Sequence, residues 1–186
     1  MDQVSFSEDI KLWERLLTGD KSALSELFKK YYSQLLSYGL KLVSDRALVK
    51  DSIQELFYSI WEQRDNLSEV EYIRSYLYVS LRRAIYRQAE IKQNRHDRDR
   101  AYSEEFFQHV INHEKLMIQE ELKEEQKREL KRGLDLLNKR EKEALFLKFY
   151  SGLTNAEIAQ VMEVNRQSVY NNIYRAIQSL KSFLDE

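Results

Sequence analysis

The stretch Leu153–Lys181, LTNAEIAQVMEVNRQSVYNNIYRAIQSLK, holds two helical patterns separated by a short turn. Thr154 followed three residues later by Glu157 is typical of a capping box, which predicts a helix starting at residue 155. Its apolar residues Ile158, Ala159 and Val161 are expected to face inward. Two helices that cross steeply after a short turn leave little room beyond a methyl group where their axes approach, and the small Ala159 meets that requirement.

The turn and the second helix follow directly. Glu163 lies where turns of this kind often carry Gly, and a left-handed conformation there would cost a non-Gly residue about 1 kcal/mol or more, so the turn must adapt or absorb strain. Asn165 suits the N-cap of the second helix. The apolar residues of that helix have helical spacing and predict one face committed to the core: Val169, Ile173, Ala176, Ile177 and Leu180.

The opposite face of the second helix is polar and carries side chains suited to DNA. It comprises Arg166, Gln167, Tyr170, Asn171, Tyr174 and Arg175. Arg, Gln and Asn match the edges of guanine or adenine, while hydroxyl and guanidinium groups suit phosphates. A helix in the major groove reads bases with its N-terminal residues, here Arg166, Gln167, Ser168 and Asn171. The segment is therefore interpreted as a DNA-binding helix-turn-helix, the alternative being an ordinary helical hairpin with a polar face.

Composition favours an all-α fold. Among 186 residues there is no Pro and there are only four Gly, so the residues that usually form strand-joining turns are scarce. The absence of Cys excludes disulfide frameworks and is compatible with a reducing compartment. No stretch approaches the ~18 apolar residues of a membrane span and no signal peptide is recognisable, so we expect a cytoplasmic protein without membrane insertion.

The chain is expected to form two small helical domains joined by a charged linker. We place the first at 1–92, the linker at 93–127 and the helix-turn-helix domain at 128–186. The first domain should contain a short helix over 10–17, helices along the apolar runs from residue 22 and over 48–61, and a third over 72–87 opened by a capping box at 68–71. In the second domain Asn138 with Glu141 predicts another helix start, and the helices should run into residue 137 and span 139–150, 155–162 and 166–184.

Two blocks of opposite charge lie at the centre of the chain, although the formal net charge is only −1. Residues 82–100 hold seven basic and three acidic side chains, whereas residues 103–127 hold seven Glu and three Lys. Either block could simply be the solvated face of a helix. The basic block follows an aromatic-rich helix, which favours a contact with nucleic acid.

The sequence offers little for catalysis. It has no glycine-rich phosphate loop, no Cys and only three His, namely His96, His109 and His113. His109 and His113 are spaced to bind a metal on one helix face, but no third ligand is placed beside them, so solvated surface is the favoured interpretation. We therefore expect neither an enzyme nor a cofactor nor a metal site.

With both halves interpreted, the chain resembles an extracytoplasmic-function (ECF) sigma factor, the compact two-domain branch of the sigma-70 family, in the style common in Bacteroidota. In the first half, Asp51-Ser-Ile-Gln54-Glu55-Leu-Phe57 followed by Trp61 is similar to the family's acidic D-x-x-Q-E-x-F segment, and Tyr76-Leu77 with Arg82 to its W-L-x-x-x-A-R-N stretch. In the second, similarity runs through 140–150, 157–159, 168–169 and 175–176. The family's Trp, Asn and a usual Asp are replaced by Tyr76, Arg83 and Arg87.

The resemblance implies a role for each block. Asp51, Gln54 and Glu55 would bind the clamp helices of the largest subunit of core RNA polymerase. The third helix would open the −10 element of promoter DNA with Tyr72, Tyr76, Arg82, Arg83 and Arg87, because aromatic and Arg side chains stack on bases and neutralise a separated strand. The helix-turn-helix would bind the −35 element with Arg166, Gln167, Ser168, Tyr170, Asn171 and Arg175.

Two other classes compete with this interpretation. A helix-turn-helix regulator acting without core polymerase accounts for the second half but leaves the segment 51–57 and the basic, Tyr-rich third helix unexplained. A helical adaptor for other proteins leaves the polar face of the last helix without a role. Members of the resembled family are commonly held inactive by an anti-sigma factor, although the chain itself shows neither such a partner nor a promoter sequence.

Overall fold

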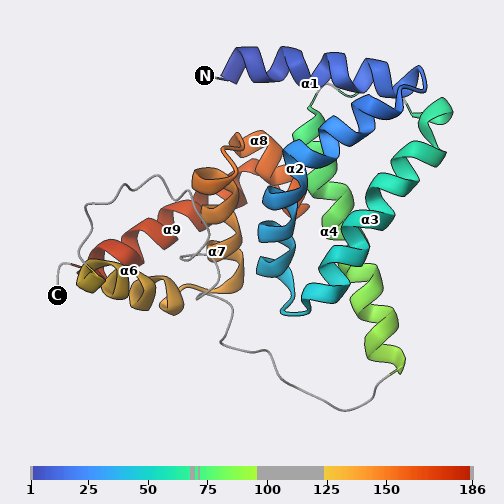
Figure 1. Cartoon of the computed structure of the whole chain (residues 1–186). Helices are drawn as coiled ribbons and strands as arrows, with labels where there is room; N and C mark the ends of the chain where they lie inside the picture. The colour runs from blue at the N-terminus through green and yellow to red at the C-terminus, as the bar shows by residue number, and fades with distance from the viewer. Residues whose placement is uncertain (1, 68–69, 71, 96–123, 185–186) are drawn as a thin grey trace. The chain divides into compact units, whose positions relative to one another are not determined.

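The computed structural model describes residues 2–67, 70, 72–95 and 124–184, and no residue in these ranges lies in a β-strand. The chain divides into two compact units, Met1–Ser103 and Glu104–Glu186. Each unit is a small group of packed helices (Figure 1). The expected all-helical fold class is therefore confirmed over the described residues.

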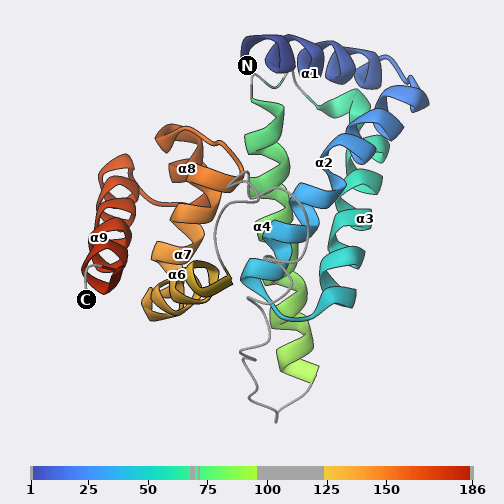
Figure 2. The same ribbon diagram turned by 60° about the vertical axis from the view of Figure 1, so that its left-hand side comes forward.

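The described residues of the first unit form four α-helices and one short 3-10 turn. They are α1 Asp2–Leu17, α2 Lys21–Leu42, α3 Arg46–Glu62, the turn η1 Arg64–Asn66 and α4 Ile73–Arg95. Helices α2, α3 and α4 lie side by side, and α1 crosses one end of that bundle in both views (Figure 1, Figure 2). The expected helices are all present, and α1 begins well before residue 10.

The starts of α2 and α3 are fixed by aspartate side chains. Asp20 accepts a hydrogen bond from the Ser22 amide at 2.8 Å, and Asp45 accepts one from the Leu48 amide at 3.0 Å. Hydrogen bonds from Ser22 and from Arg15 hold the pKa of Asp20 at about 2, below its usual range. Such caps satisfy amide groups that have no partner within the first turn of a helix.

The core of the first unit is dense where α2 passes α3 and α4. Gly39 of α2 is buried, and a Cβ added there would lie 2.4 Å from Val49 Cγ1 of α3 and 3.0 Å from Ile85 Cδ1 of α4. Tyr38 beside it is fully buried against Tyr78 of α4, with ring centroids 4.9 Å apart. Glycine thus permits the close approach that brings the three helices together.

Helix α1 is attached to this bundle by an apolar and a polar contact. Trp13 is buried and meets Tyr76 of α4 edge to face, with ring centroids 5.4 Å apart. The buried carboxylate of Asp9 accepts a hydrogen bond from the Tyr31 hydroxyl and lies 2.7 Å from Lys30 Nζ. Burial, followed by the neighbouring Asp9 carboxylate, raises the pKa of Tyr31 well above its usual range, so the phenol stays protonated.

The second unit comprises α6 Glu124–Leu136, α7 Lys139–Leu145, a π-helical turn η3 at Phe146–Tyr150, α8 Asn155–Met162 and α9 Arg166–Leu184. Asn138 and Glu141 form the expected capping box, with Asn138 Oδ1 3.0 Å from the Glu141 amide and Glu141 Oε2 3.1 Å from the Asn138 amide. The helix expected over 139–150 is α-helical from residue 139 to residue 145 and π-helical from residue 146 to residue 150. The capping box expected at 68–71 lies largely outside the described residues, as does most of the linker expected at 93–127.

We expect Gly39→Ala to lower the free energy of unfolding of the first unit by about 1–3 kcal/mol, because the added methyl group would overpack the contact with Val49. Both tryptophans of the chain, Trp13 and Trp61, lie in this unit, so tryptophan fluorescence during urea unfolding follows it selectively. Ser33→Ala, at an exposed position of the same helix, is the control and should change stability by less than about 0.5 kcal/mol. Equal stability of the two variants would contradict the proposed tightness of this contact.

Candidate nucleic-acid interface

The two helices of the expected helix-turn-helix are α8 and α9. Thr154 and Glu157 form the predicted capping box, with Glu157 Oε2 2.8 Å from the Thr154 amide and Thr154 Oγ1 3.3 Å from the Glu157 amide. Ile158, Ala159 and Val161 are buried as predicted. The preceding helical turn η3 ends at Tyr150, and Gly152 two residues later has a φ of 65°, in the left-handed region that glycine adopts without penalty.

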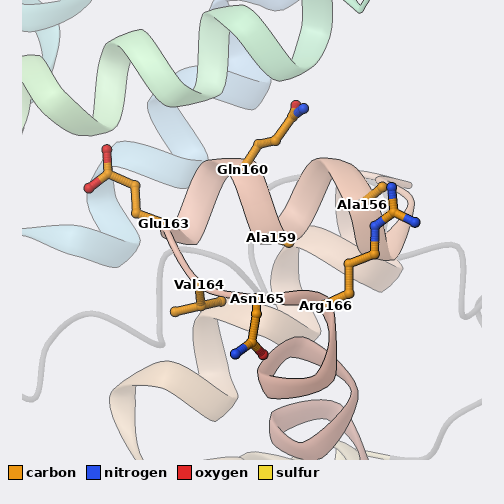
Figure 3. Close-up of a pocket in the computed structure, with 7 residues that line it drawn as sticks. All are labelled: Ala156, Ala159, Gln160, Glu163, Val164, Asn165 and Arg166. Carbon is orange, nitrogen blue, oxygen red and sulfur yellow. The ribbon is translucent and has the colours of Figure 1, made fainter.

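The turn between α8 and α9 is left-handed at Glu163, with φ 54° and ψ 47°. The Val164 amide returns to the Ala159 carbonyl at 3.0 Å, which satisfies the end of α8. Of the two outcomes expected for this turn, adaptation or strain, the structure shows the second, with a non-glycine residue in the left-handed region. A shallow open cleft lies in the angle of the motif, lined by Ala156, Ala159 and Gln160 of α8 and by residues 163–166 (Figure 3).

Helix α9 begins where the sequence predicted. Asn165 Oδ1 accepts a hydrogen bond from the Ser168 amide at 2.7 Å, which makes Asn165 the cap. Val169 and Ala176 are fully buried, and Ile173 and Leu180 are half-buried. The prediction that Ile177 belongs to the core was wrong: its side chain is 42% exposed, because the apolar stripe of this long helix is wider than the surface that covers it.

The outer face of α9 is polar and exposed, as expected. Arg166, Gln167, Tyr170, Asn171, Tyr174 and Arg175 are all exposed, and Ser168 is half-buried. Gln167 Nε2 donates a hydrogen bond to Asn171 Oδ1 at 3.1 Å. The rings of Tyr170 and Tyr174 lie nearly parallel, 12° between planes, with centroids 6.3 Å apart. A face with guanidinium, amide and hydroxyl groups over two turns can contact both base edges and phosphates.

The three polar residues that the sequence singled out on α3, Asp51, Gln54 and Glu55, do not share one environment. Asp51 and Gln54 are exposed, whereas Glu55 is half-buried and turns toward α4. One oxygen of Glu55 lies 2.5 Å from Arg87 Nη2 and the other 2.5 Å from Gln88 Nε2. The Gln88 side chain in turn accepts a hydrogen bond from the buried Ser52 hydroxyl at 3.2 Å. The structure therefore joins Glu55 and Arg87, for which separate roles were predicted.

One aromatic residue on the outer face of α3 was missed by the sequence argument. Tyr58 is 65% exposed, and it follows Asp51 by seven residues and Gln54 by four, so the three share one face of the helix. The same helical spacing that identified the core of α3 could have found it. Exposed tyrosines are frequent anchors of protein interfaces.

Aromatic residues in and just before helix α4 are divided between core and surface. Tyr78 is fully buried, Tyr76 is half-buried against Trp13, and Tyr72, which immediately precedes the helix, is 44% exposed. Arg83 and Arg87 are exposed, and Arg82 is half-buried with its guanidinium carbon 4.8 Å from the centroid of the Tyr86 ring. Tyr86 itself is 45% exposed and was not singled out from the sequence. Arginine and tyrosine side chains are therefore both accessible along α4.

Neither a metal site nor a membrane span is found in the part of the chain that the structure describes. No group of His, Asp and Glu there could hold a metal ion, and His109 with His113 lies outside the described ranges. None of the described helices combines the length and the apolar character that crossing a membrane requires.

Comparisons with known proteins match both units. The family model described as Sigma-70 region 2 matches residues 27–96, and the one described as Sigma-70, region 4 matches residues 127–180. No curated protein matches the chain significantly.

Two solved structures share the fold. One is CnrH in complex with the cytosolic domain of CnrY, with a TM-score of 0.62 and 17% identity over 95% of this chain and 97% of that chain. The other is the sigma factor RpoE in complex with the anti-sigma factor NepR from Bartonella quintana, with a TM-score of 0.59 and 16% identity over 87% of this chain and 96% of that chain.

Proposed function

We propose an assignment of roles to the helices of this chain, which belongs to the sigma-70 family and, as a sigma factor, directs RNA polymerase to promoters. The family is not enzymatic. We assign the chain to the ECF branch, with a region 2-like domain at 1–92, a linker at 93–127 and a region 4-like domain at 128–186. The observation that carries the assignment of roles is the polar face of α9 in the second unit. This face is exposed and lies opposite Val169 and Ala176, which belong to the core.

Helix α9 docks in the major groove of the −35 element. Its first two turns present Arg166, Gln167, Ser168, Tyr170 and Asn171, and the N-terminal part of a recognition helix is the part that reaches base edges. Arg166 suits guanine, because a guanidinium group donates to both O6 and N7. Arg175, more than two turns further along, contacts phosphate.

Arg166→Ala should weaken binding of the holoenzyme to a selected promoter by about 5- to 100-fold, since a bidentate base contact is worth about 1–3 kcal/mol. Binding to random duplex should fall much less. The promoter is first selected by transcription from a randomised library, and affinities are then measured by fluorescence anisotropy. Arg175→Ala is the comparison: it should weaken binding to both duplexes similarly and reduce the slope of log affinity against log salt by about 0.9. If Arg166→Ala lowered the affinity for the promoter and for random duplex equally, Arg166 would not contact a base.

The outer face of α3 binds the clamp helices of the largest polymerase subunit. Asp51 and Gln54 are exposed there, with Tyr58 on the same face as a central aromatic anchor. Glu55 lies at the edge of this face, and its carboxylate is engaged by Arg87 and Gln88. We therefore assign two roles to Glu55, which borders the polymerase-binding face and orients the side chains of Arg87 and Gln88 on α4.

Asp51→Ala combined with Gln54→Ala should reduce affinity for bacterial core RNA polymerase at least about tenfold, as loss of central interface contacts commonly does. The tryptophan-monitored unfolding of the first unit should not change, because both residues are exposed. Asp65→Ala removes an exposed acid from η1, off this face, and should leave polymerase affinity unaltered. An unchanged affinity in the double variant would refute the assigned face.

The exposed side of α4 opens and holds the −10 element. Tyr72 offers an accessible ring, Tyr76 is partly accessible, and Arg82, Arg83 and Arg87 supply positive charge along the same helix. Aromatic rings stack on unpaired bases whatever their identity, and arginine neutralises the backbone of a separated strand. Tyr78 takes no part, because it is fully buried in the core.

Arg83→Ala should weaken binding of the holoenzyme to a single-stranded oligonucleotide carrying the −10 sequence of the selected promoter. If Arg83 neutralises one phosphate, the slope of log affinity against log salt should fall by about 0.7, the value for single strands. Lys29→Ala, an exposed site on α2, should leave both affinity and slope unchanged. A slope that is identical in wild type and Arg83→Ala would exclude this contact.

The setting of the protein follows from these partners. Core polymerase and promoter DNA place its action in the cytoplasm, and the chemistry calls for no cofactor. An anti-sigma factor is a further proposed partner, supported by the solved complexes of CnrH with CnrY and of RpoE with NepR. A regulator acting without polymerase, the alternative considered from sequence, does not account for the region 2 match over 27–96.

A further inference from the structure

We propose that Gln167 reads one adenine of the upstream promoter element and that Asn171 positions the Gln167 amide for this contact. The inference rests on the proposed docking of α9 in the major groove. Both side chains are exposed, they lie one turn apart at the start of α9, and Gln167 Nε2 donates to Asn171 Oδ1 at 3.1 Å.

The hydrogen bond leaves Gln167 with a defined set of groups for a ligand. A primary amide has two N–H donors and one oxygen acceptor. One N–H is used by Asn171, so Gln167 keeps Oε1 as an acceptor and one N–H as a donor. The amide can therefore still make one bond of each kind.

Among the four bases, adenine matches this pair of groups. In the major groove adenine presents a donor at N6 beside an acceptor at N7, whereas guanine presents two acceptors. Cytosine offers an amino donor and thymine a carbonyl acceptor, so each satisfies only one of the two groups on Gln167. Guanine suits the neighbouring Arg166 instead, which carries only donors. The start of α9 thus presents two neighbouring side chains that suit different bases, Arg166 for guanine and Gln167 for adenine.

Asn171 contributes by restricting the rotamers of the Gln167 side chain before DNA binds. An exposed glutamine samples many rotamers, and ordering it on binding opposes affinity. Asn171, held on the same helix, fixes the direction in which the Gln167 amide points. The competing explanation is that the pair only stabilises the helix surface, as amide pairs four residues apart do. The two explanations differ in base preference.

The experiment measures base preference with the whole holoenzyme. Upstream sequences are selected from a randomised duplex library by wild-type holoenzyme, and affinities are then measured for all four bases at each selected position. We expect one position where adenine is preferred at least about tenfold over the other bases. Gln167→Ala should abolish that preference and Asn171→Ala should reduce it severalfold. Asn171→Asp keeps an oxygen acceptor for Gln167, so it should retain the preference while its charge weakens binding to every duplex.

Atomic substitutions in the DNA identify the contact. Purine in place of the adenine removes the N6 amino group, and 7-deazaadenine removes N7. Each should weaken binding by wild type severalfold or more and have no effect on binding by Gln167→Ala. Gln178→Ala, an exposed glutamine further along α9, should behave as wild type throughout.

Two failures are distinguishable. If adenine preference survives Gln167→Ala, or no position prefers adenine, while Arg166→Ala still alters the selected sequence, the adenine assignment is wrong and base reading by α9 stands. If neither Arg166→Ala nor Gln167→Ala changes preference at any position, α9 does not read bases and both proposals fall. If Asn171→Ala lowered thermal stability but left base preference unchanged, the hydrogen bond between Gln167 and Asn171 would only stabilise the helix.

Discussion

Every helix must satisfy the backbone amides of its first turn, and in a chain without proline and with only four glycines this requirement falls on polar side chains. Asp20, Asp45, Asn138, Thr154 and Asn165 each accept a hydrogen bond from an amide two or three residues further along. These caps decide where five helices begin. Two of the proposed binding surfaces, on α3 and on α9, lie on helices that begin at these caps.

The consequence is clearest in the helix-turn-helix. Thr154 and Asn165 fix the starts of α8 and α9, and the left-handed Glu163 between them sets the direction in which α9 leaves the turn. A left-handed residue other than glycine costs about 1 kcal/mol or more, which the buried contacts around Ala159 and Val169 must offset. Buried residues on both sides of the turn, Ala159 in α8 and Val169 in α9, determine which side of α9 stays outward. Binding residues placed on a packed helix are held more precisely than residues on a loop.

Local sequence patterns predicted the parts of this protein that local interactions determine. The capping boxes at Asn138 and Thr154 and the exposed residues of α9 follow from neighbours within about four positions, which is the range over which helix periodicity is informative. Contacts between distant residues were beyond that range. Nothing near Glu55 in the sequence indicates Arg87, and periodicity alone could not decide that Tyr78 is buried while Tyr72 is exposed. Ile177 was misplaced because a regular apolar stripe can extend beyond the surface against which it packs.

The contact between Glu55 and Arg87 shows how the two proposed surfaces of the first unit are related. Arg87 stands where the resembled family usually has Asp, so in this chain a positive side chain meets the carboxylate on α3. Exposed ion pairs contribute only about 0–1 kcal/mol, too little to hold two helices in register. The close packing of Gly39, Val49 and Ile85 holds them instead. The ion pair and the Gln88 amide orient side chains on that fixed frame, so a side-chain contact joins the proposed polymerase-binding face of α3 to the proposed DNA-binding side of α4.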